Sequence, residues 1–471
     1  MDFPVFHLDF LGNRMLIALI AVVHVWINHS LAVGAMPLIT AMEFWGHRRG
    51  DERWDRLAYR ILTVCFVITT TLGALTGVGI WLSTSLVNPY AIGSLIRVFF
   101  WAWFVEWIVF VAEVVFIMIY YLTWKKMKER KAAHIAVGAI LSLFSWVTMA
   151  IITAILGFMM NPGAWAARET FLSGVFNPIY LPQLAFRTPV AMLAAGWLAL
   201  FLAFFFTHRD RDLRTKAVRL ISVWSLVWLP FAAAGALWYW RVIPGWMAVN
   251  VPVALGTQRF AAWYGQLLVV LAAMAATVGG AALVGTVLPK RMPRVALLAP
   301  FAMTLVLLGS FERVREFIRK PYVIGDYMYA NGLRVADYPL YKEDGVLRHA
   351  TYTSVRTVTD DNAVAAGAEV FKLTCTRCHT ATGVNAVTDR LRDMYGNGPW
   401  DRDTVKYYLL GMHTARPFMP PFPGTEREAG ALADYLLDLR AARRPVIGAQ
   451  DGGVELPPRD GGGSGSREGG A

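Results

Sequence analysis

Residues 98–124, VFFWAWFVEWIVFVAEVVFIMIYYLTW, are the stretch that decides the fold. Only two of these 27 side chains, Glu106 and Glu113, are charged. An α-helix needs about 20 apolar residues to cross the hydrocarbon core of a bilayer, so this stretch predicts a transmembrane helix. The whole chain of 471 residues is 56% hydrophobic, with 18 Trp and 27 Phe, and is too apolar for an ordinary water-soluble domain.

The same apolar pattern recurs over the first two thirds of the chain and predicts an all-α, polytopic transmembrane helix bundle. We expect about eight spans, at residues 14–44, 58–84, 98–124, 133–160, 181–207, 217–240, 261–288 and 293–318. Lys and Arg concentrate in the connections after spans one, three, five and seven, which the positive-inside rule places in the cytoplasm. The N-terminus and the segment after span eight then lie on the periplasmic side of a bacterial inner (cell) membrane. Because the net charge of +12 gathers in these loops, it does not indicate nucleic-acid binding.

A second motif, Cys375-Thr-Arg-Cys378-His379, follows the predicted bundle. Two cysteines two residues apart and an adjoining histidine are what one covalent haem c requires: two thioether links and a proximal iron ligand. The alternative is a chance redox or zinc C-x-x-C. Zinc would need a second ligand pair, and the one other cysteine, Cys65, lies in an apolar run. The sequence therefore predicts haem c.

The flanks of this motif predict two amphipathic helices, at residues 363–374 and 426–440, with Pro417-Phe-Met-Pro-Pro421 just before the second. The arrangement resembles a small all-α class I cytochrome c domain over residues 361–443. The resemblance implies Met419 as the sixth iron ligand, with Met412 and His413 as alternatives. The predicted domains are residues 1–320 (membrane), 321–360 (extracytoplasmic connector) and 361–443 (cytochrome c), followed by a disordered Gly-rich tail at 444–471.

Ionisable side chains within the spans are candidate functional groups, because burying a charge in a bilayer is costly. His24 is a candidate metal ligand, and a histidine bonded to a backbone carbonyl is its alternative. Glu106 and Glu113 lie nearly two helical turns apart on one face, so they could carry protons or ligate a metal. A structural carboxylate paired with an arginine such as Arg97 is the alternative for this pair. Glu43, near the inner end of span one, could simply snorkel to the membrane surface.

With these residues in view, the eight spans resemble subunit I of the cytochrome bd quinol oxidases. Arg14 followed ten residues later by His24 matches the opening span of that family, whose histidine ligates high-spin haem. The Glu106 and Glu113 pair resembles the two glutamates of its third span, although the separation is one residue shorter. Residues 319–326, RKPYVIGD, resemble its Gly-Arg-Gln-Pro-Trp and Ile-Gly-Glu motifs. Arg319 would then pair with haem propionates, as would Arg14, and Asp326 would replace a ligating glutamate.

Three departures from that family concern its low-spin haem b and its quinol site. In the family a span-five histidine and a span-seven methionine hold the low-spin haem. Here the matching segments read Phe186-Arg187 and Gln266-Leu267, and Met274 is a weak substitute. The quinol loop is reduced to residues 241–259. The resemblance implies haem b and/or haem d in the bundle, a second membrane subunit like bd subunit II, and a periplasmic electron donor or acceptor such as a cytochrome.

Two main hypotheses follow from the sequence. In the first, the chain is an enzyme, a bd-like terminal oxidase subunit in which electrons pass from haem c to high-spin haem. Glu106 and Glu113 are its candidate catalytic residues, and protons arrive through Glu113. In the second, the chain moves electrons between a quinol pool and periplasmic cytochromes without oxygen chemistry. A purely anchoring role for the bundle is a third hypothesis, which titratable groups such as His24 argue against.

Overall fold

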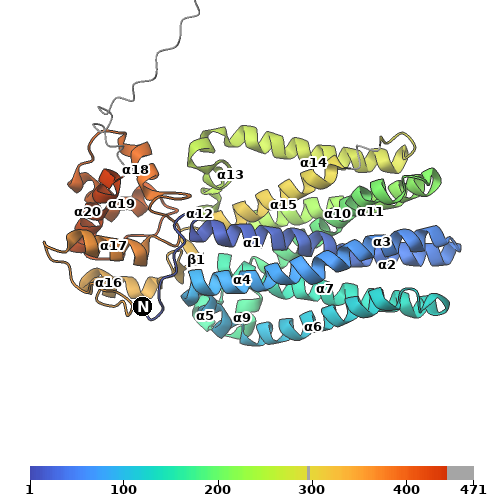
Figure 1. Ribbon diagram of the computed structural model, residues 1–471, viewed down its shortest axis with the longest axis horizontal. Coiled ribbons are helices and arrows are strands. Elements are labelled where there is room, and N and C mark those ends of the chain that lie inside the picture. Colours follow the sequence, from blue (N-terminus) through green and yellow to red (C-terminus); the bar gives the residue numbers. More distant parts are fainter. Residues whose placement is uncertain (294–297, 443–471) are drawn as a thin grey trace, which may run out of the picture.

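The computed structural model describes residues 1–293 and 298–442. Helices of residues 13–318 run side by side in one elongated bundle, and the C-terminal domain covers one end of it (Figure 1). The first half of the bundle contains α1 (Asn13–Ile27), η1 (Asn28–Val33), α2 (Ala35–Arg49), α3 (Glu52–Ile68), η2 (Thr69–Gly73), α4 (Ala74–Val87), α5 (Pro89–Val98), α6 (Phe100–Thr123), η3 (Lys128–Arg130) and α7 (Lys131–Met160). The second half contains α8 (Trp165–Arg168), α9 (Phe171–Val175), α10 (Tyr180–Phe206), α11 (Arg211–Val242), α12 (Gly245–Ala248), α13 (Val251–Phe260), η4 (Ala261–Trp263), α14 (Tyr264–Val287) and α15 (Ala299–Ile318).

Seven helical stretches within the described residues are long and apolar enough to cross a membrane, which confirms the all-α membrane bundle. They correspond to the first seven predicted spans, with ends that differ by a few residues, and they run over Asn13–Arg49, Glu52–Val87, Phe100–Thr123, Lys128–Met160, Tyr180–Phe206, Arg211–Val242 and Ala261–Val287. The eighth predicted span corresponds to α15. This helix packs in the bundle but carries four charged residues near its C-terminal end, so it is less apolar than the other seven. Residues 294–297 of that predicted span lie outside the described part of the chain.

Helix α10 is the most buried of these stretches, with 72% of its most apolar window inside the protein, whereas α6 and α14 have 11% each. Small residues explain why neighbouring helices approach α10 so closely. A Cβ at Gly196 would lie 2.7 Å from the Ser225 hydroxyl of α11, and a Cβ at Gly34 would overlap the Ala191 carbonyl. Helices α6 and α14 therefore lie at the periphery and present large apolar side chains outward.

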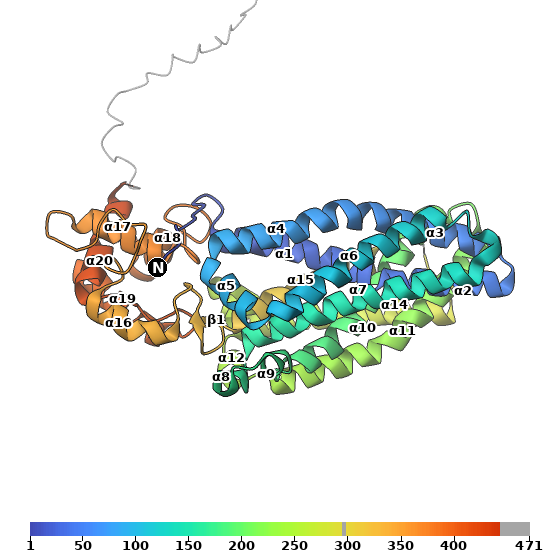
Figure 2. The same ribbon diagram turned by 90° about the horizontal axis from the view of Figure 1, so that it is seen from below.

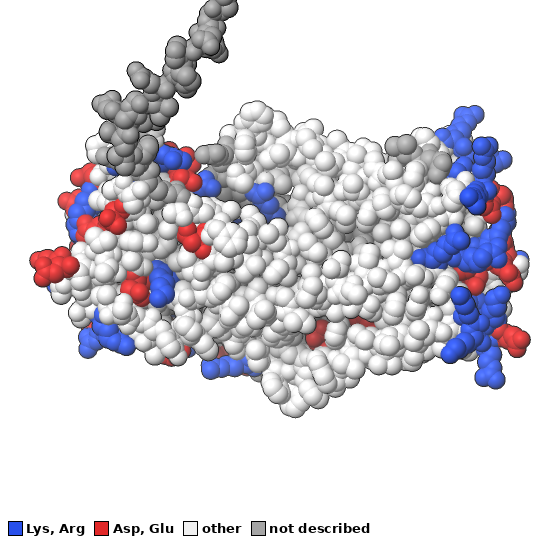
Figure 3. All heavy atoms as spheres, viewed as in Figure 1, with Lys and Arg blue, Asp and Glu red and all other residues white. Residues whose placement is uncertain are grey.

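Charged side chains divide the bundle into an apolar middle and two different ends. Lys and Arg gather at the end far from the C-terminal domain, on the α2–α3, α6–α7 and α10–α11 connections (Figure 3). We call this the basic end; its charged connections are residues 48–56, 125–131 and 208–219. The basic end carries the loops that the positive-inside rule assigned to the cytoplasm.

The C-terminal domain begins with a hairpin of β1 (Tyr322–Ile324) and β2 (Met328–Tyr329), followed by η6 (Val335–Asp337) and α16 (Tyr338–Asp344). Helices α17 (Ala363–Thr374), α18 (Val387–Tyr395), α19 (Arg402–Ala415) and α20 (Glu426–Ala442) complete it (Figure 2). α17 and α20 confirm the two predicted amphipathic helices. They pack closely because Gly367 leaves room for the Ala431 carbonyl. The predicted tail at 444–471 lies outside the described residues.

Candidate functional site

The haem-binding turn starts where α17 ends. The amide N–H of Cys378 and that of His379 both donate to the Cys375 carbonyl, at 3.0 and 2.9 Å, so the motif closes one compact turn. His379 Nδ1 lies 3.3 Å from the carbonyl of Asn385, and the Asn385 amide donates to the Cys378 carbonyl at 2.7 Å. With Nδ1 bonded to a carbonyl, the imidazole has its Nε2 lone pair available for iron. Burial lowers the pKa of His379 to about 4, which keeps this ring neutral.

His413, one of the two alternatives to Met419 as the sixth iron ligand, holds the Met-Pro-Pro loop in place. His413 Nδ1 donates to the Met419 carbonyl at 2.6 Å, and the Met419 amide donates to the Arg416 carbonyl at 2.8 Å. Met412 packs against the core of the C-terminal domain. Both cysteines of the motif are free, and Cys65 is buried in the core of the bundle. The residues of this domain therefore fit one covalent haem c with a His379 ligand, and Met419 stays the predicted sixth ligand.

The haem-binding turn is packed directly against the membrane bundle. The buried Arg377, inside the C-x-x-C motif itself, donates from Nε to the Val87 carbonyl at the end of α4, at 3.2 Å. Asp9, just before α1, accepts from the amide of Ala381 at 2.6 Å and from that of Thr382 at 3.2 Å. Burial raises the pKa of Asp9, but hydrogen bonds from the Thr382 side chain and the Ala381 amide outweigh it, so the pKa lies below its usual value.

A contact between the two domains also joins the Met-Pro-Pro loop to the end of α15. The rings of Phe418 and Phe317 have centroids 5.5 Å apart, and the guanidinium of Arg14 lies 5.0 Å from the Phe317 ring. The residue before Met419 therefore touches the bundle beside Arg14, the residue predicted to bind haem propionates.

Arg14 and Arg319, 305 positions apart in the sequence, meet at Glu316. Arg14 lies 3.0 Å from the Glu316 carboxylate, Lys320 also 3.0 Å, and Arg319 3.8 Å. Three cations around one carboxylate leave positive charge unbalanced, and the buried Nε of Arg319 has no hydrogen-bond partner among the described residues. A buried donor without a partner is costly, so this cluster fits the carboxylates of a haem.

His24 lies on α1 against α4. Its Nδ1 is 3.1 Å from the Thr76 hydroxyl, which itself donates to the Leu72 carbonyl at 2.7 Å, so the ring donates here and keeps Nε2 as an acceptor. A Cβ at Gly77 would lie 3.2 Å from the His24 ring. The π-helical segments η1 and η2 lie close by, and such segments are frequent at functional sites. His24 thus has the tautomer that a haem ligand needs.

The two glutamates of α6 have different surroundings. Glu113 accepts from the Ser145 hydroxyl at 2.6 Å and from that of Thr148 at 3.4 Å, both on α7. Glu106 is half-buried and has no hydrogen-bond partner among the described residues, and no ion pair joins either glutamate to Arg97 in that part of the chain. Glu113 is therefore held in the bundle, while Glu106 lies between outward-facing apolar side chains such as Val105 and Trp107.

A buried ion cluster occupies the part of span five where the related family has a haem-ligating histidine. The guanidinium of Arg187 lies 2.5 Å from Glu312 and 3.2 Å from Nε2 of His29, and Arg315 lies 2.9 Å from Glu312. These side chains are all at least four-fifths buried. Arg187 therefore makes structural contacts across η1, α10 and α15, and Glu312 is buried.

Asp326 lies outside the helices, at the tip of the β1–β2 hairpin. It is exposed and has a φ of 54°, and its carboxylate is within hydrogen-bonding reach of the Tyr322 hydroxyl. No three His, Cys, Asp or Glu side chains converge on a common metal position within residues 1–293 and 298–442, so the structure does not bring His24, Glu113 and Asp326 together as one ligand set. Asp326 as a ligand stays a prediction that no contact of this structure supports.

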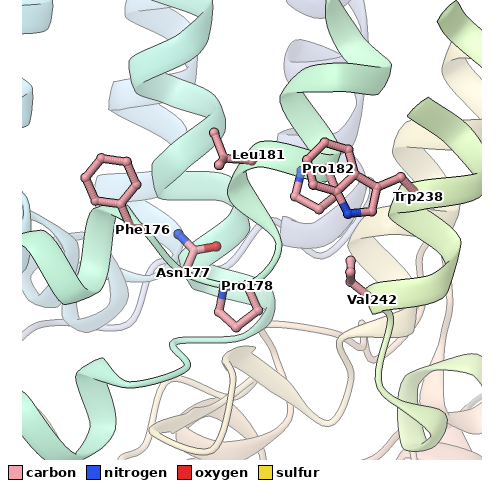
Figure 4. Close-up of a pocket in the computed structure, with 7 residues that line it drawn as sticks. All are labelled: Phe176, Asn177, Pro178, Leu181, Pro182, Trp238 and Val242. Atoms are coloured by element: carbon pink, nitrogen blue, oxygen red, sulfur yellow. The ribbon is translucent and has the colours of Figure 1, made fainter. Parts of the chain in front are cut away.

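A small cavity of about 200 Å³ opens where the Asn177-Pro178 segment meets α11, between Leu181 and Trp238 (Figure 4). Its wall is mostly apolar, and the Asn177 amide donates to the carbonyls of Ala154 and Gly174, at 2.9 Å each. None of the predicted site residues lines this cavity.

Sequence reasoning missed one group of functional candidates. Glu43 does not snorkel: it is fully buried. It lies 2.6 Å from both Lys131 and His134 and accepts a hydrogen bond from the Tyr120 hydroxyl at 2.7 Å. The sequence did contain a signal for this group: Glu43 lies near the end of span one, and Lys131 and His134 lie near the start of span four.

Comparisons with known proteins agree with this architecture. Residues 13–238 match the family model "Cytochrome bd terminal oxidase subunit I", and residues 362–436 match "Cytochrome C oxidase, cbb3-type, subunit III". Among solved structures, the bd oxidase from Geobacillus thermodenitrificans is similar, with a TM-score of 0.57 and 16% identity over 68% of this chain and 90% of that chain. At that identity the likeness concerns the fold alone. No curated protein matches.

The two family matches support a haem-containing respiratory oxidoreductase of the membrane. Within that class, the membrane region of this chain is similar to cytochrome bd subunit I and its C-terminal region is similar to a cytochrome c subunit, as the sequence predicted.

Proposed function

We propose that this chain is an oxidase subunit in which electrons enter at haem c from a periplasmic donor and pass into the bundle for dioxygen reduction. The observation that carries this proposal is the direct packing of the haem-binding turn and the Met-Pro-Pro loop on the bundle. Arg377 and Phe418 contact the bundle, and Asp9, just before α1, contacts the turn, so a haem bound at this turn would lie beside the cluster of Arg14 and Arg319.

Each residue then has a defined task. Cys375 and Cys378 hold haem c by thioether bonds, and His379 and Met419 hold its iron. His24 ligates a haem b or haem d in the bundle, and Arg14 and Arg319 bind propionates. The bound haems supply the redox chemistry.

Glu113 accepts hydrogen bonds from the hydroxyls of Ser145 and Thr148, and Glu106 lies about two turns away on the same face of α6. Two carboxylates on one face can pass a proton along the helix. We infer that their task is to deliver protons to the oxygen-reducing haem.

The basic end faces the cytoplasm in this proposal, and the C-terminal domain faces the periplasm. The distribution of Lys and Arg supports that orientation. The outward apolar faces of α6 and α14 support a second membrane subunit like bd subunit II, because the half-buried Glu106 lies on one of them.

The test has two parts. A pyridine-haemochrome spectrum of the purified protein gives the ratio of haem c to haem b and d, and His24→Ala is expected to lose the membrane haem while keeping haem c. Oxygen uptake with a reduced c-type donor is then measured for the wild type and for His24→Ala. Uptake by the wild type alone supports the proposal, and no uptake by a fully haem-loaded wild type refutes it.

A further inference from the structure

A network of titratable groups inside the bundle lies at the basic end, far from the haem-binding turn. Glu43 of α2, Asp55 of α3, Tyr120 of α6, and Lys131 and His134 of α7 contact one another there. We call these five residues the basic-end cluster. Glu43 and His134 have 0% exposed side chains, and Lys131 has 9%. Buried ionisable groups in a membrane bundle are costly and call for a function.

The hydrogen bonds of His134 contain one proton more than a neutral ring supplies. Its Nδ1 lies 2.6 Å from the Glu43 carboxyl group, and its Nε2 lies 2.9 Å from the backbone carbonyl of Tyr120. The carbonyl can only accept, so Nε2 donates to it. The hydrogen bond between Nδ1 and Glu43 then needs a second proton, which His134 and Glu43 share.

The charges of the cluster lead to the same assignment. Lys131 lies 2.6 Å from Glu43 and 2.6 Å from Asp55, so one ammonium faces two carboxylates. With one shared proton on His134 or Glu43, the four groups carry no net charge. Without that proton they would carry a net negative charge in a buried site, which is unfavourable. The cluster therefore binds one exchangeable proton.

One side of the cluster reaches water. Asp55 has 20% of its side chain exposed, and its second carboxylate oxygen accepts from the Trp124 indole at 3.0 Å. The basic α6–α7 connection, with Lys125 and Lys126, lies next to it. Lys131 contacts both Asp55 and Glu43, so a proton from this face passes one buried side chain before it reaches Glu43 and His134.

The other side of the cluster leads toward the glutamates of the proposed site. Tyr120 follows Glu113 by seven residues and Glu106 by fourteen, so all three share one face of α6 at intervals of roughly 10 Å. The Thr40 hydroxyl reaches that of Tyr120, and Ser145 on α7 donates to Glu113 at 2.6 Å. Hydroxyl groups both donate and accept, and a bridging water can complete such a chain.

Gly138 lets α2, α6 and α7 pack closely beside the cluster. A Cβ at this position would lie 2.5 Å from the Thr40 hydroxyl and 2.8 Å from the Tyr120 ring. The absence of a side chain lets the two hydroxyl-bearing residues lie against α7.

We propose that the basic-end cluster takes up protons from the side of the basic end, holds one between His134 and Glu43, and passes it by way of Tyr120 to Glu113. In each step one N–H or O–H bond breaks as the next forms, and no electron moves. This inference rests on the proposed function for its destination, Glu113, whereas the uptake step itself depends only on the cluster.

The test uses the haem-loaded protein in liposomes with a pH-sensitive dye on the side of the basic end. The oxidised protein is reduced without oxygen, and proton uptake is timed in the wild type and in Glu43→Gln. We expect Glu43→Gln to keep its haems but to slow uptake from that side at least tenfold. Glu43→Asp should restore part of the rate, which a merely structural role would not predict. Asp212→Asn is the matched control, because Asp212 is an exposed carboxylate at the same end that pairs with Lys216, and it should behave as the wild type.

Wild-type uptake by haem-loaded Glu43→Gln would overturn the inference, as would a wild type that takes up protons only from the side of the C-terminal domain. If Glu43→Gln does not fold, Tyr120→Phe takes its place, since it removes one hydroxyl and keeps the buried ring, and the same tenfold slowing is required. A wild type that takes up protons through the cluster but consumes no oxygen would refute the proposed function and leave this inference standing.

Discussion

Among the described residues, Glu312 is the carboxylate that forms ion pairs with both Arg187 and Arg315, and its replacement tests how the ion cluster of span five is stabilised. Its carboxylate lies 2.5 Å from Arg187 and 2.9 Å from Arg315, with side-chain exposures of 6% for Glu312, 2% for Arg187 and 11% for Arg315. Glu312→Gln keeps the shape but leaves two guanidinium groups without a negative partner. Breaking a buried pair by removing one partner costs about 3–5 kcal/mol.

We expect a loss of about 3 kcal/mol, at the lower end of that range, because the amide oxygen of glutamine still accepts one hydrogen bond. Denaturant titration of the haem-loaded protein in detergent, followed by tryptophan fluorescence, measures the free energy of unfolding. Arg187→Met in the Glu312→Gln background should recover part of the loss, because it removes one of the unpaired charges.

The matched control is Glu52→Gln at the basic end. Glu52 has 72% of its side chain exposed and pairs with Arg56 at 3.4 Å, so its replacement should cost only about 0.5 kcal/mol or less. If Glu312→Gln changed the free energy of unfolding no more than Glu52→Gln does, the buried pair would contribute little, and the reasoning about Arg187 would be wrong.

Three further predictions concern the rest of the molecule. Met419→Leu should convert ferric haem c from a low-spin to a high-spin absorption spectrum, whereas Met412→Leu should leave the spectrum unchanged; identical spectra for both would remove Met419 as the ligand. Asp9→Asn should lower the thermal stability near neutral pH, because the carboxylate has a lowered pKa and stabilises the fold above its usual pKa of 3.8. That difference should shrink as the pH falls through the lowered pKa, and a constant difference across thermal melts from pH 6 to pH 3 would contradict it. Gly138→Ala should cost about 1–3 kcal/mol by overpacking against Thr40, while Gly280→Ala, with nothing within 4 Å, should not destabilise, as denaturant titration would show.

The parts that the sequence predicted correctly depend on short-range patterns. Apolar runs about 20 residues long must become helices in a bilayer, because their backbone groups have no other hydrogen-bond partners there. The haem motif is equally local: Cys375, Cys378 and His379 lie within five residues, and α17 brings them into one turn whatever surrounds it.

Only the tertiary structure shows which side chains that are far apart in the chain contact one another. Arg14 meets Arg319 at Glu316, Arg187 pairs with Glu312 and His29, and Glu43 lies buried against Lys131 and His134. From hydropathy alone, Glu43 could snorkel to the membrane surface, because a charged residue near the end of a span can either snorkel or be buried with partners. Which one occurs depends on which helices pack beside it, and that packing follows from small residues such as Gly138 and Gly196 on neighbouring helices.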